Sequence, residues 1–267
     1  MVKEILWPIV SLGGLGFLFG AGLAIANKKF GVASDPKVDA VREVLPGANC
    51  GACGYPGCDG FASAAVKGEA PPDGCTVGGG PVGQKVAAIL GMEVEEKEPT
   101  VARVMCNGDC QSAKNKYEYD GIQDCVAASM LSDGPKSCRF GCMGLGSCVK
   151  ACPFDAIHVI DGIAVVDEEK CTSCGKCVVA CPKGIIRIVP KSNKVHVLCM
   201  SKDAGKIVRT NCDVGCIGCR MCTKVCPTEA IKVNNNLASI DYSKCINCGK
   251  CAEKCPTKAI YIKSEAQ

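Results

Sequence analysis

A cysteine motif that occurs three times constrains this chain more than any other feature of its sequence. The pattern Cys-x2-Cys-x2-Cys-x3-Cys-Pro begins at Cys171, Cys216 and Cys245. A fourth unit, residues 141–157, has Leu145 where the later copy has Cys219. All four units end in the phrase Cys-Pro-x-x-(Ala or Ile)-Ile, at Cys152, Cys181, Cys226 and Cys255. This self-similarity predicts a repeat array from about residue 100 onward.

The cysteine content narrows the chemistry of this array. The chain has 267 residues and 25 cysteines, and an odd number of cysteines in a long chain argues against a disulfide scaffold. The repeated run is the signature of bacterial ferredoxins, in which the first three cysteines hold one [4Fe–4S] cluster and the fourth ligates the other cluster of a pair. The pattern therefore predicts iron–sulfur clusters, with zinc as the weaker alternative. A net charge of +4 implies no nucleic-acid partner.

The crossed ligand pattern assigns the cysteines of the array to four clusters. The expected sets are Cys216, Cys219, Cys222 with Cys255; Cys245, Cys248, Cys251 with Cys226; Cys171, Cys174, Cys177 with Cys152; and Cys142, Cys148 with Cys181. The last set lacks one thiolate because of Leu145, and we expect Cys138 to supply it. A three-iron cluster is one alternative. Another is that Cys138 belongs to a different cluster, together with Cys106, Cys110 and Cys125.

A separate group of cysteines lies nearer the N-terminus. Cys50, Cys53, Cys58 and Cys75 have the spacing C-x2-C-x4-C-x16-C, which suits a cluster better than zinc but does not exclude zinc. Five cysteines then remain. Four of them could hold a sixth [4Fe–4S] cluster, and the spacing does not decide which four. They are Cys106, Cys110, Cys125, Cys199 and Cys212.

Short apolar segments beside the cysteine runs predict the fold. AIHVI, IAVVD, IIRIV, AIKV, ASIDY and AIYIK have the length and composition of short strands. We expect an α+β chain with two tandem bacterial-ferredoxin-like modules, each with two short hairpins. The predicted division is a membrane anchor 1–28, an N-terminal [4Fe–4S] domain 34–91, a linker 92–100, a cysteine-containing insertion 101–137, a first module 138–190, a connector 191–209 and a second module 210–263.

Residues 5–26 form an apolar run that carries no charge. A helix of this length can cross a hydrocarbon core of ~30 Å. Lys28 and Lys29 follow the run, so the positive-inside tendency predicts a single-pass anchor with the clusters on the cytoplasmic side. A secretory signal peptide is the alternative, because Ala24-Ile25-Ala26 resembles a cleavage site.

No group of residues in the sequence has the pattern of a catalytic site. His158 and His196 both lie on strand-like stretches and are expected to be structural. No G-x-G-x-x-G follows a strand, so we expect neither a flavin nor a nicotinamide site. Since [4Fe–4S] clusters carry one electron at a time, the chain is expected to relay electrons between the active sites of other proteins.

The order of these features resembles a known family. One apolar helix, then "LPGANCGACGYPGC", then a cysteine-rich array is similar over essentially the whole chain to the B subunit of the Rnf complex, in the extended form of anaerobic clostridia-like bacteria. The resemblance implies a subunit at the cell membrane that accepts electrons from reduced ferredoxin and relays them to other membrane subunits of an ion-pumping ferredoxin:NAD⁺ oxidoreductase. It implies part of an enzyme complex, without a complete active site in this chain.

Two other functions fit the sequence less well. One is an iron–sulfur relay subunit of a different membrane oxidoreductase, of the hydrogenase or heterodisulfide-reductase type. The other is a structural protein that binds zinc.

Overall fold

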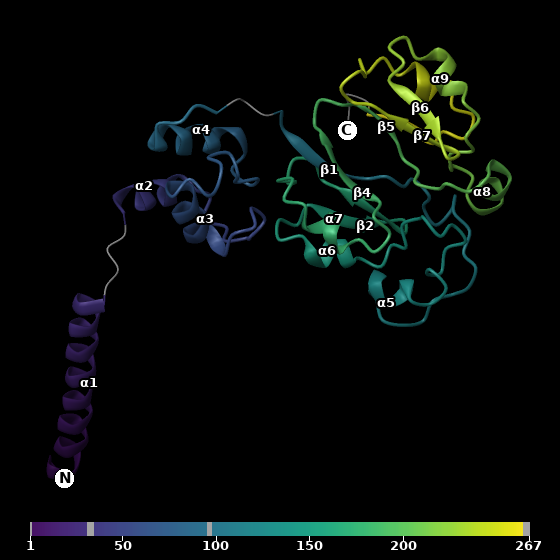
Figure 1. The fold of residues 1–267 in the computed structure, drawn as a ribbon. Helices are drawn as coiled ribbons and strands as arrows, with labels where there is room; N and C mark the ends of the chain where they lie inside the picture. Colours follow the sequence, from purple (N-terminus) through teal and green to yellow (C-terminus); the bar gives the residue numbers. More distant parts are fainter. Residues whose placement is uncertain (1, 31–34, 95–97, 264–267) are drawn as a thin grey trace.

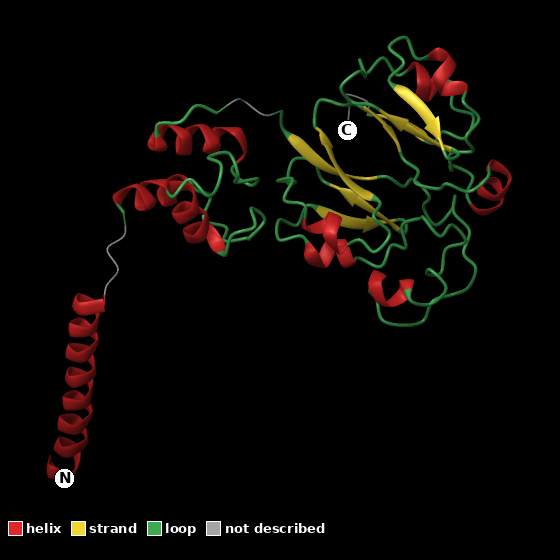
Figure 2. Ribbon diagram, viewed as in Figure 1, coloured by secondary structure: helices red, strands yellow, loops and turns green. Residues whose placement is uncertain are grey.

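The computed structural model describes residues 2–30, 35–94 and 98–263, and it describes the side chains of the first helix between residues 12 and 26. The chain begins with one long helix and continues as a mixture of short helices and short antiparallel strands (Figures 1 and 2). The helices are α1 (Val2–Phe30), α2 (Pro36–Val44), α3 (Gly57–Val66), α4 (Gly79–Leu90), α5 (Cys125–Ser129), α6 (Ser147–Ala151), α7 (Lys176–Ala180), α8 (Gly205–Asn211), α9 (Met221–Val225) and α10 (Lys250–Glu253). The strands are β1 (Thr100–Val104), β2 (Ile157–Ile160), β3 (Ile163–Val166), β4 (Ile186–Pro190), β5 (Val195–Val197), β6 (Ile231–Asn234), β7 (Leu237–Ile240) and β8 (Ile260–Ile262).

The first helix, α1, runs without interruption from Val2 to Phe30. Its described large apolar side chains are exposed, among them Leu12 and Phe17. Within the described residues, no helix combines the length and the apolar character needed to span a bilayer. Residue 1 of the predicted anchor, and the side chains of Lys28 and Lys29, lie outside the described part of the chain.

Helices α2, α3 and α4 form the N-terminal domain. Asp35 caps α2 by accepting a hydrogen bond from the amide of Lys37, and Gly91 ends α4 in the left-handed conformation at φ 70°. Val41, Phe61 and Val86, one from each helix, meet in a small core. This core fixes the helix ends that flank the loops carrying Cys50, Cys53, Cys58 and Cys75.

The six predicted strands of the array are confirmed. β2 and β3 form one antiparallel hairpin, and β6 and β7 form another. The two hairpins turn at Asp161-Gly162 and at Asn235-Asn236, where all four residues have positive φ. Such a turn matches the twist of the strands on either side and favours Asp, Asn and Gly.

The sequence did not predict two strands, β1 and β5. β1 pairs with β4 from Thr100↔Pro190 to Val104↔Ile186, and β5 pairs with β8. Each module therefore has one hairpin and one pairing between its first and last strands. The prediction of a second hairpin in each module is wrong. β1 lies where we expected linker and insertion, and β5 lies in the expected connector. Both were missed because each is short and far in sequence from its partner.

The two modules have separate cores and pack against each other. Ile157, Ile185 and Ile186 are buried in the first, and Val195, Ile231 and Ile260 in the second. Cysteines are members of both cores, which explains how a chain with 4% aromatic residues can fill them.

One cluster of polar contacts between the modules surrounds Glu168. Glu168 of the first module accepts hydrogen bonds from Arg103 and, at 2.8 Å, from Lys263 of the second. His196 is fully buried nearby, with Nδ1 2.9 Å from the Tyr242 hydroxyl and Nε2 2.9 Å from the Asn193 carbonyl. His196 is therefore structural, as expected from its place on a strand.

Candidate iron–sulfur centres

The four cysteine loops of the array share one backbone shape. In each loop the second cysteine position lies between two residues with positive φ: Gly144 and Gly146, Ser173 and Gly175, Gly218 and Arg220, and Asn247 and Gly249. A short helix begins directly after each loop: α6, α7, α9 and α10. Leu145 therefore occupies the position that Cys174, Cys219 and Cys248 occupy in the other loops.

The loop around Leu145 cannot easily take another shape. A Cβ atom built on Gly144 would lie 2.5 Å from the carbonyl oxygen of Gly162, so the loop and the β2–β3 turn are in close contact. Gly144 also has φ 73°, which a residue with a side chain rarely adopts. The leucine thus replaces a cysteine in an otherwise unchanged loop.

The structure gathers the cysteines around hollows in groups of four. Three of these groups are those expected from the spacing: Cys50, Cys53, Cys58 and Cys75; Cys216, Cys219, Cys222 and Cys255; Cys226, Cys245, Cys248 and Cys251. A further group brings Cys152, Cys171 and Cys174 close enough to Cys177 to raise the pKa of its thiol to about 11, after the larger effect of burial.

The hollow beside Leu145 differs from the expectation. Its four cysteines are Cys125, Cys142, Cys148 and Cys181, so Cys125 and not Cys138 stands in the gap left by the leucine. Leu145 packs against Cys125 together with Met143. The fourth cysteine of this hollow therefore comes from the segment that precedes the first module.

A hydrogen-bonded link explains why Cys125 reaches this hollow. Asp124 caps α5 by accepting hydrogen bonds from the amides of Val126 and Ala127, at 2.8 and 3.1 Å. The Ser147 hydroxyl at the start of α6 donates to Asp124 and accepts from the Cys125 amide, both at 2.7 Å. The start of α5 is thereby fixed to the start of α6, which is the helix that carries Cys148. The hydrogen bond from Ser147 also holds the pKa of Asp124 below its usual value.

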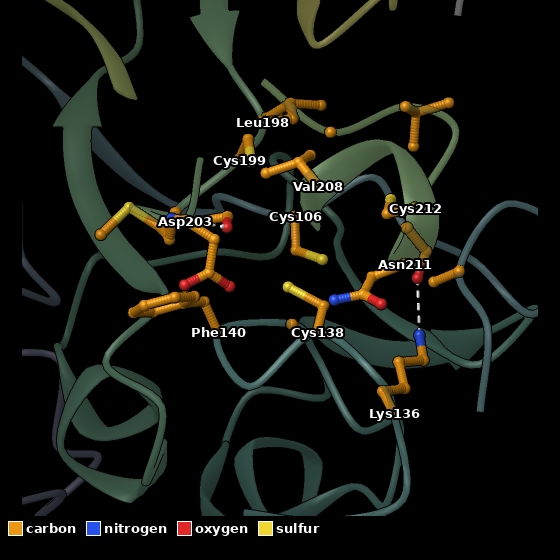
Figure 3. A pocket seen from close by; sticks show the side chains of 17 residues that line it. Cys106, Lys136, Cys138, Phe140, Leu198, Cys199, Asp203, Val208, Asn211 and Cys212 are labelled. Carbon is orange, nitrogen blue, oxygen red and sulfur yellow. Dashed lines mark hydrogen bonds between the residues drawn. The ribbon is translucent and has the colours of Figure 1, made fainter. Parts of the chain in front are cut away.

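Cys138 lies in a different hollow, shown in Figure 3, with Cys106, Cys199 and Cys212. Cys106 follows β1, Cys199 follows β5 and Cys212 follows α8, so both modules contribute. Backbone bridges from Ala113 to Cys212 and from Asn115 to Lys136 connect the segment before Cys138 to the second module. This connection is the physical reason that Cys138 is not available to the hollow beside Leu145.

Cys110 is the cysteine that remains. All 25 cysteines are described, and the six groups above use every one of them except Cys110. It is exposed, and its amide donates to the carbonyl of Asp161 at 2.8 Å. Of the five candidates for a sixth cluster, the structure brings Cys106, Cys199 and Cys212 together, places Cys125 elsewhere and leaves Cys110 apart.

The chemistry of these hollows suits a bound cationic centre. Burial, followed by the nearby Cys142, Cys125 and Cys181, raises the pKa of Cys148 to about 12. Four thiolates so close together in an apolar surrounding need a positive charge among them. Backbone amides already point at sulfur, from Gly78 to Cys75, from Ala102 to Cys171 and from Ala164 to Cys142.

The cysteines of each group stand apart from one another around their hollow. Among the described residues, no three Cys, His, Asp or Glu side chains are close enough together to hold one metal ion. The cysteines instead line the walls of each hollow, as [4Fe–4S] clusters require of their four thiolates. The residues present thus suit that group.

The hollow that contains Cys138 lies between two others. On one side, Cys106 Sγ accepts a hydrogen bond from the Cys142 amide at 3.4 Å. On the other side, burial raises the pKa of the Cys199 thiol to about 12. The charge of the nearby Cys216 contributes to this rise, so Cys199 and Cys216 lie close together. The structure therefore has an unbroken series of hollows from the first module to the second.

The fold and these cysteine groups define an iron–sulfur protein of the ferredoxin type. Comparison with family models agrees: one for an Fe-S cluster matches residues 45–77, one for a 4Fe-4S binding domain matches 238–261, and one for a 4Fe-4S dicluster domain matches 137–185 and 170–230.

Relatives identify the family. The chain is 51% identical over 245 residues to the B subunit of the Na⁺-translocating ferredoxin:NAD⁺ oxidoreductase complex of Acetobacterium woodii, covering 91% of this chain and 74% of that one. It is 48% identical to the B subunit of the ion-translocating oxidoreductase complex of Methanosarcina acetivorans, with coverage of 91% and 93%. Identity to the counterpart from the proton-translocating complex of Clostridium ljungdahlii is 46%, with coverage of 91% and 86%. The chain belongs to the family of Rnf-type B subunits, and it is an iron–sulfur electron-transfer subunit of such an oxidoreductase complex.

Proposed function

We propose that this chain carries electrons from reduced ferredoxin to the membrane subunits of an ion-translocating ferredoxin:NAD⁺ oxidoreductase, through six [4Fe–4S] clusters. When bound, each cluster accepts and releases one electron at a time. The observation that carries the proposal is the series of four-cysteine hollows across the two modules, because a relay needs neighbouring stations. The names of the relatives, which include both Na⁺- and proton-translocating complexes, support the place of the chain in the reaction.

The proposed ligand sets follow the hollows. Four retain the pairing expected from the sequence: Cys50, Cys53, Cys58 and Cys75; Cys152, Cys171, Cys174 and Cys177; Cys216, Cys219, Cys222 and Cys255; Cys226, Cys245, Cys248 and Cys251. The two others are Cys125, Cys142, Cys148 and Cys181, and Cys106, Cys138, Cys199 and Cys212. Cys110 is not a ligand in this proposal.

The proposal includes a membrane location. Residues 5–26 carry no charge and belong to one continuous helix, α1. We assign this run as a single-pass anchor that keeps the clusters on the cytoplasmic side, where Lys28 and Lys29 follow it. The domain division is the one expected from the sequence, with the first module extended to include β1 and the second to include β5, since each strand pairs within that module.

One experiment tests the function directly. The full chain, purified without oxygen, is analysed for iron and acid-labile sulfide and then mixed with reduced ferredoxin while its absorbance is followed. We expect about four irons and four sulfides per cluster, together with bleaching on the addition of ferredoxin. A zinc-containing, colourless protein would refute the cluster assignment. An iron–sulfur protein that ferredoxin does not reduce would refute the donor, and its co-purifying membrane subunits would show whether it serves a hydrogenase or heterodisulfide-reductase type of complex.

A further inference from the structure

A buried lysine lines the hollow between the two modules. Lys136 is 5% exposed, and among the described residues it is the one buried lysine or arginine. Its ammonium donates hydrogen bonds to the carbonyl oxygens of Gly108 at 2.5 Å and Gly162 at 3.2 Å. In Figure 3 its side chain lies in the wall of the hollow that also contains Cys106, Cys138 and Cys212.

The position of this ammonium is fixed by its partners. Gly108 lies in the loop that follows Cys106, and Gly162 lies in the turn of the β2–β3 hairpin. The backbone bridge between Asn115 and Lys136 holds the lysine from its own side. Three separate segments therefore keep the positive charge in the wall of this hollow, where it acts on Cys212.

Few charged groups offset the positive charge of Lys136. Carbonyl oxygens satisfy an ammonium without neutralising it, and buried charges act strongly on their neighbours because little water screens them. Asp109 lies near enough for the charge of Lys136 to contribute, after the hydrogen bonds with Ser112, to the lowered pKa of its carboxyl, so this partly exposed carboxylate offsets part of the positive charge. Asp203, which also lines the hollow, is paired with Arg139 at 3.1 Å.

The other hollows differ in the charged side chains that line them. Those of Cys50 and of Cys226 have no charged side chain other than cysteine in their walls. The hollow beside Leu145 includes Lys183, but that ammonium lies 3.8 Å from the carboxylate of Asp133. The hollow of Cys216 includes Arg220, but that residue is exposed. Among these hollows, the junction between the modules is therefore the one lined by a buried lysine or arginine.

We propose that Lys136 tunes the junction: its buried ammonium raises the reduction potential of the cluster held by Cys106, Cys138, Cys199 and Cys212. Net charge near a cluster is one of the factors that set its potential, and a cation stabilises the reduced form, which carries one more negative charge. In this proposal Lys136 is not a ligand of the cluster and acts on it only through its charge. The inference rests on the proposed ligand set of this hollow.

The test compares reduction potentials in the full chain with its clusters. Lys136→Met removes the charge and nearly keeps the length, and Lys136→Arg keeps the charge. Lys114→Met is the matched control, because Lys114 is exposed and follows Ala113, which lines the same hollow. Cys212→Ala identifies which spectroscopic signal belongs to the junction. Each variant is titrated with reductant and followed by electron paramagnetic resonance, with iron measured in parallel.

In Lys136→Met we expect the midpoint potential of one signal to become more negative. That signal should be the one that is lost in Cys212→Ala. The midpoint should move much less in Lys136→Arg and not at all in Lys114→Met. An unchanged midpoint with full iron content would overturn the proposal. So would loss of the junction's iron from Lys136→Met and also from Lys136→Gln, because the lysine would then be needed only to build the site. If Cys212→Ala leaves every four-iron signal unchanged, the ligand set itself is wrong, whatever Lys136 does.

Discussion

Replacing Cys125 by alanine tests the least expected feature of the structure. The change leaves Cys142, Cys148 and Cys181 as three thiols around their hollow. The cluster there should lose about one of its four irons and become a three-iron centre. Such a centre is recognised by its signal in the oxidised protein, and the total iron content should fall by the same small amount.

The structure predicts that the effect stays local. The amide of residue 125 keeps its buried hydrogen bond to the Ser147 hydroxyl, which contributes about 1 kcal/mol. Ala128 is fully buried against Met143 and is untouched by the change. Removing one sulfur from this small core costs about 1 kcal/mol, so α5 should remain in place and the unfolding midpoint should change little.

A second substitution makes the test sharper. Leu145 lies between Gly144 and Gly146 in the loop shape that holds Cys219 in the other module. Leu145→Cys should therefore restore the four-iron cluster in a Cys125→Ala background. Cys110→Ala is the control, because Cys110 is exposed and outside the six groups. The reasoning would be refuted if Cys125→Ala kept all its iron while Cys138→Ala gave the three-iron signal and Leu145→Cys rescued it.

Three further results are expected. Deleting residues 1–28 should release a brown, soluble protein that no longer supports membrane-coupled electron transfer; recovery of the truncated chain in membranes without its partner subunits would contradict the anchor. Reduction by an acidic ferredoxin should slow steeply as salt rises, since screening weakens the attraction of exposed lysines, and a rate independent of salt would count against docking by charge. These lysines are Lys224, Lys250, Lys254 and Lys258. Burial, followed by the charge of Arg103, lowers the pKa of His196 to about 4 from an ordinary 6.5. Folding stability should therefore fall as the pH drops from about 6.5 to about 4, by about 3 kcal/mol at most. The stability of the His196→Gln variant, measured by denaturant titration at each pH, should fall less over the same range. An equal loss of stability in both proteins would exclude the histidine as the cause.

The sequence predicted what depends on local spacing. Cysteines separated by two intervening residues and followed by Cys-Pro indicated the loops. The apolar segments after them indicated β2, β4, β6 and β8. The structure also brings Cys222 together with Cys255, at the distance along the chain that the crossed ferredoxin pattern requires. These features follow from a repeat whose members each contain the information for their own shape.

The sequence did not predict what depends on contacts between distant segments. Cys125 and Cys138 are separated by the same interval as Cys199 and Cys212. In the structure Cys199 and Cys212 share a hollow, whereas Cys125 and Cys138 lie in different ones. The difference comes from the hydrogen bonds of Ser147 to the start of α5, and no spacing rule records a contact of that kind.

The hollow at the junction has a consequence for the order in which the protein matures. Cys106 and Cys138 are synthesised with the first module, but Cys199 and Cys212 follow only when the second module is made. Four thiolates can therefore meet there only after the two modules have folded against each other, whereas the hollow of Cys50 is complete within its own domain. Because metal binding of this kind adds its free energy to folding, iron bound at the junction would lock the finished arrangement, and its presence would report that assembly of the whole chain is complete.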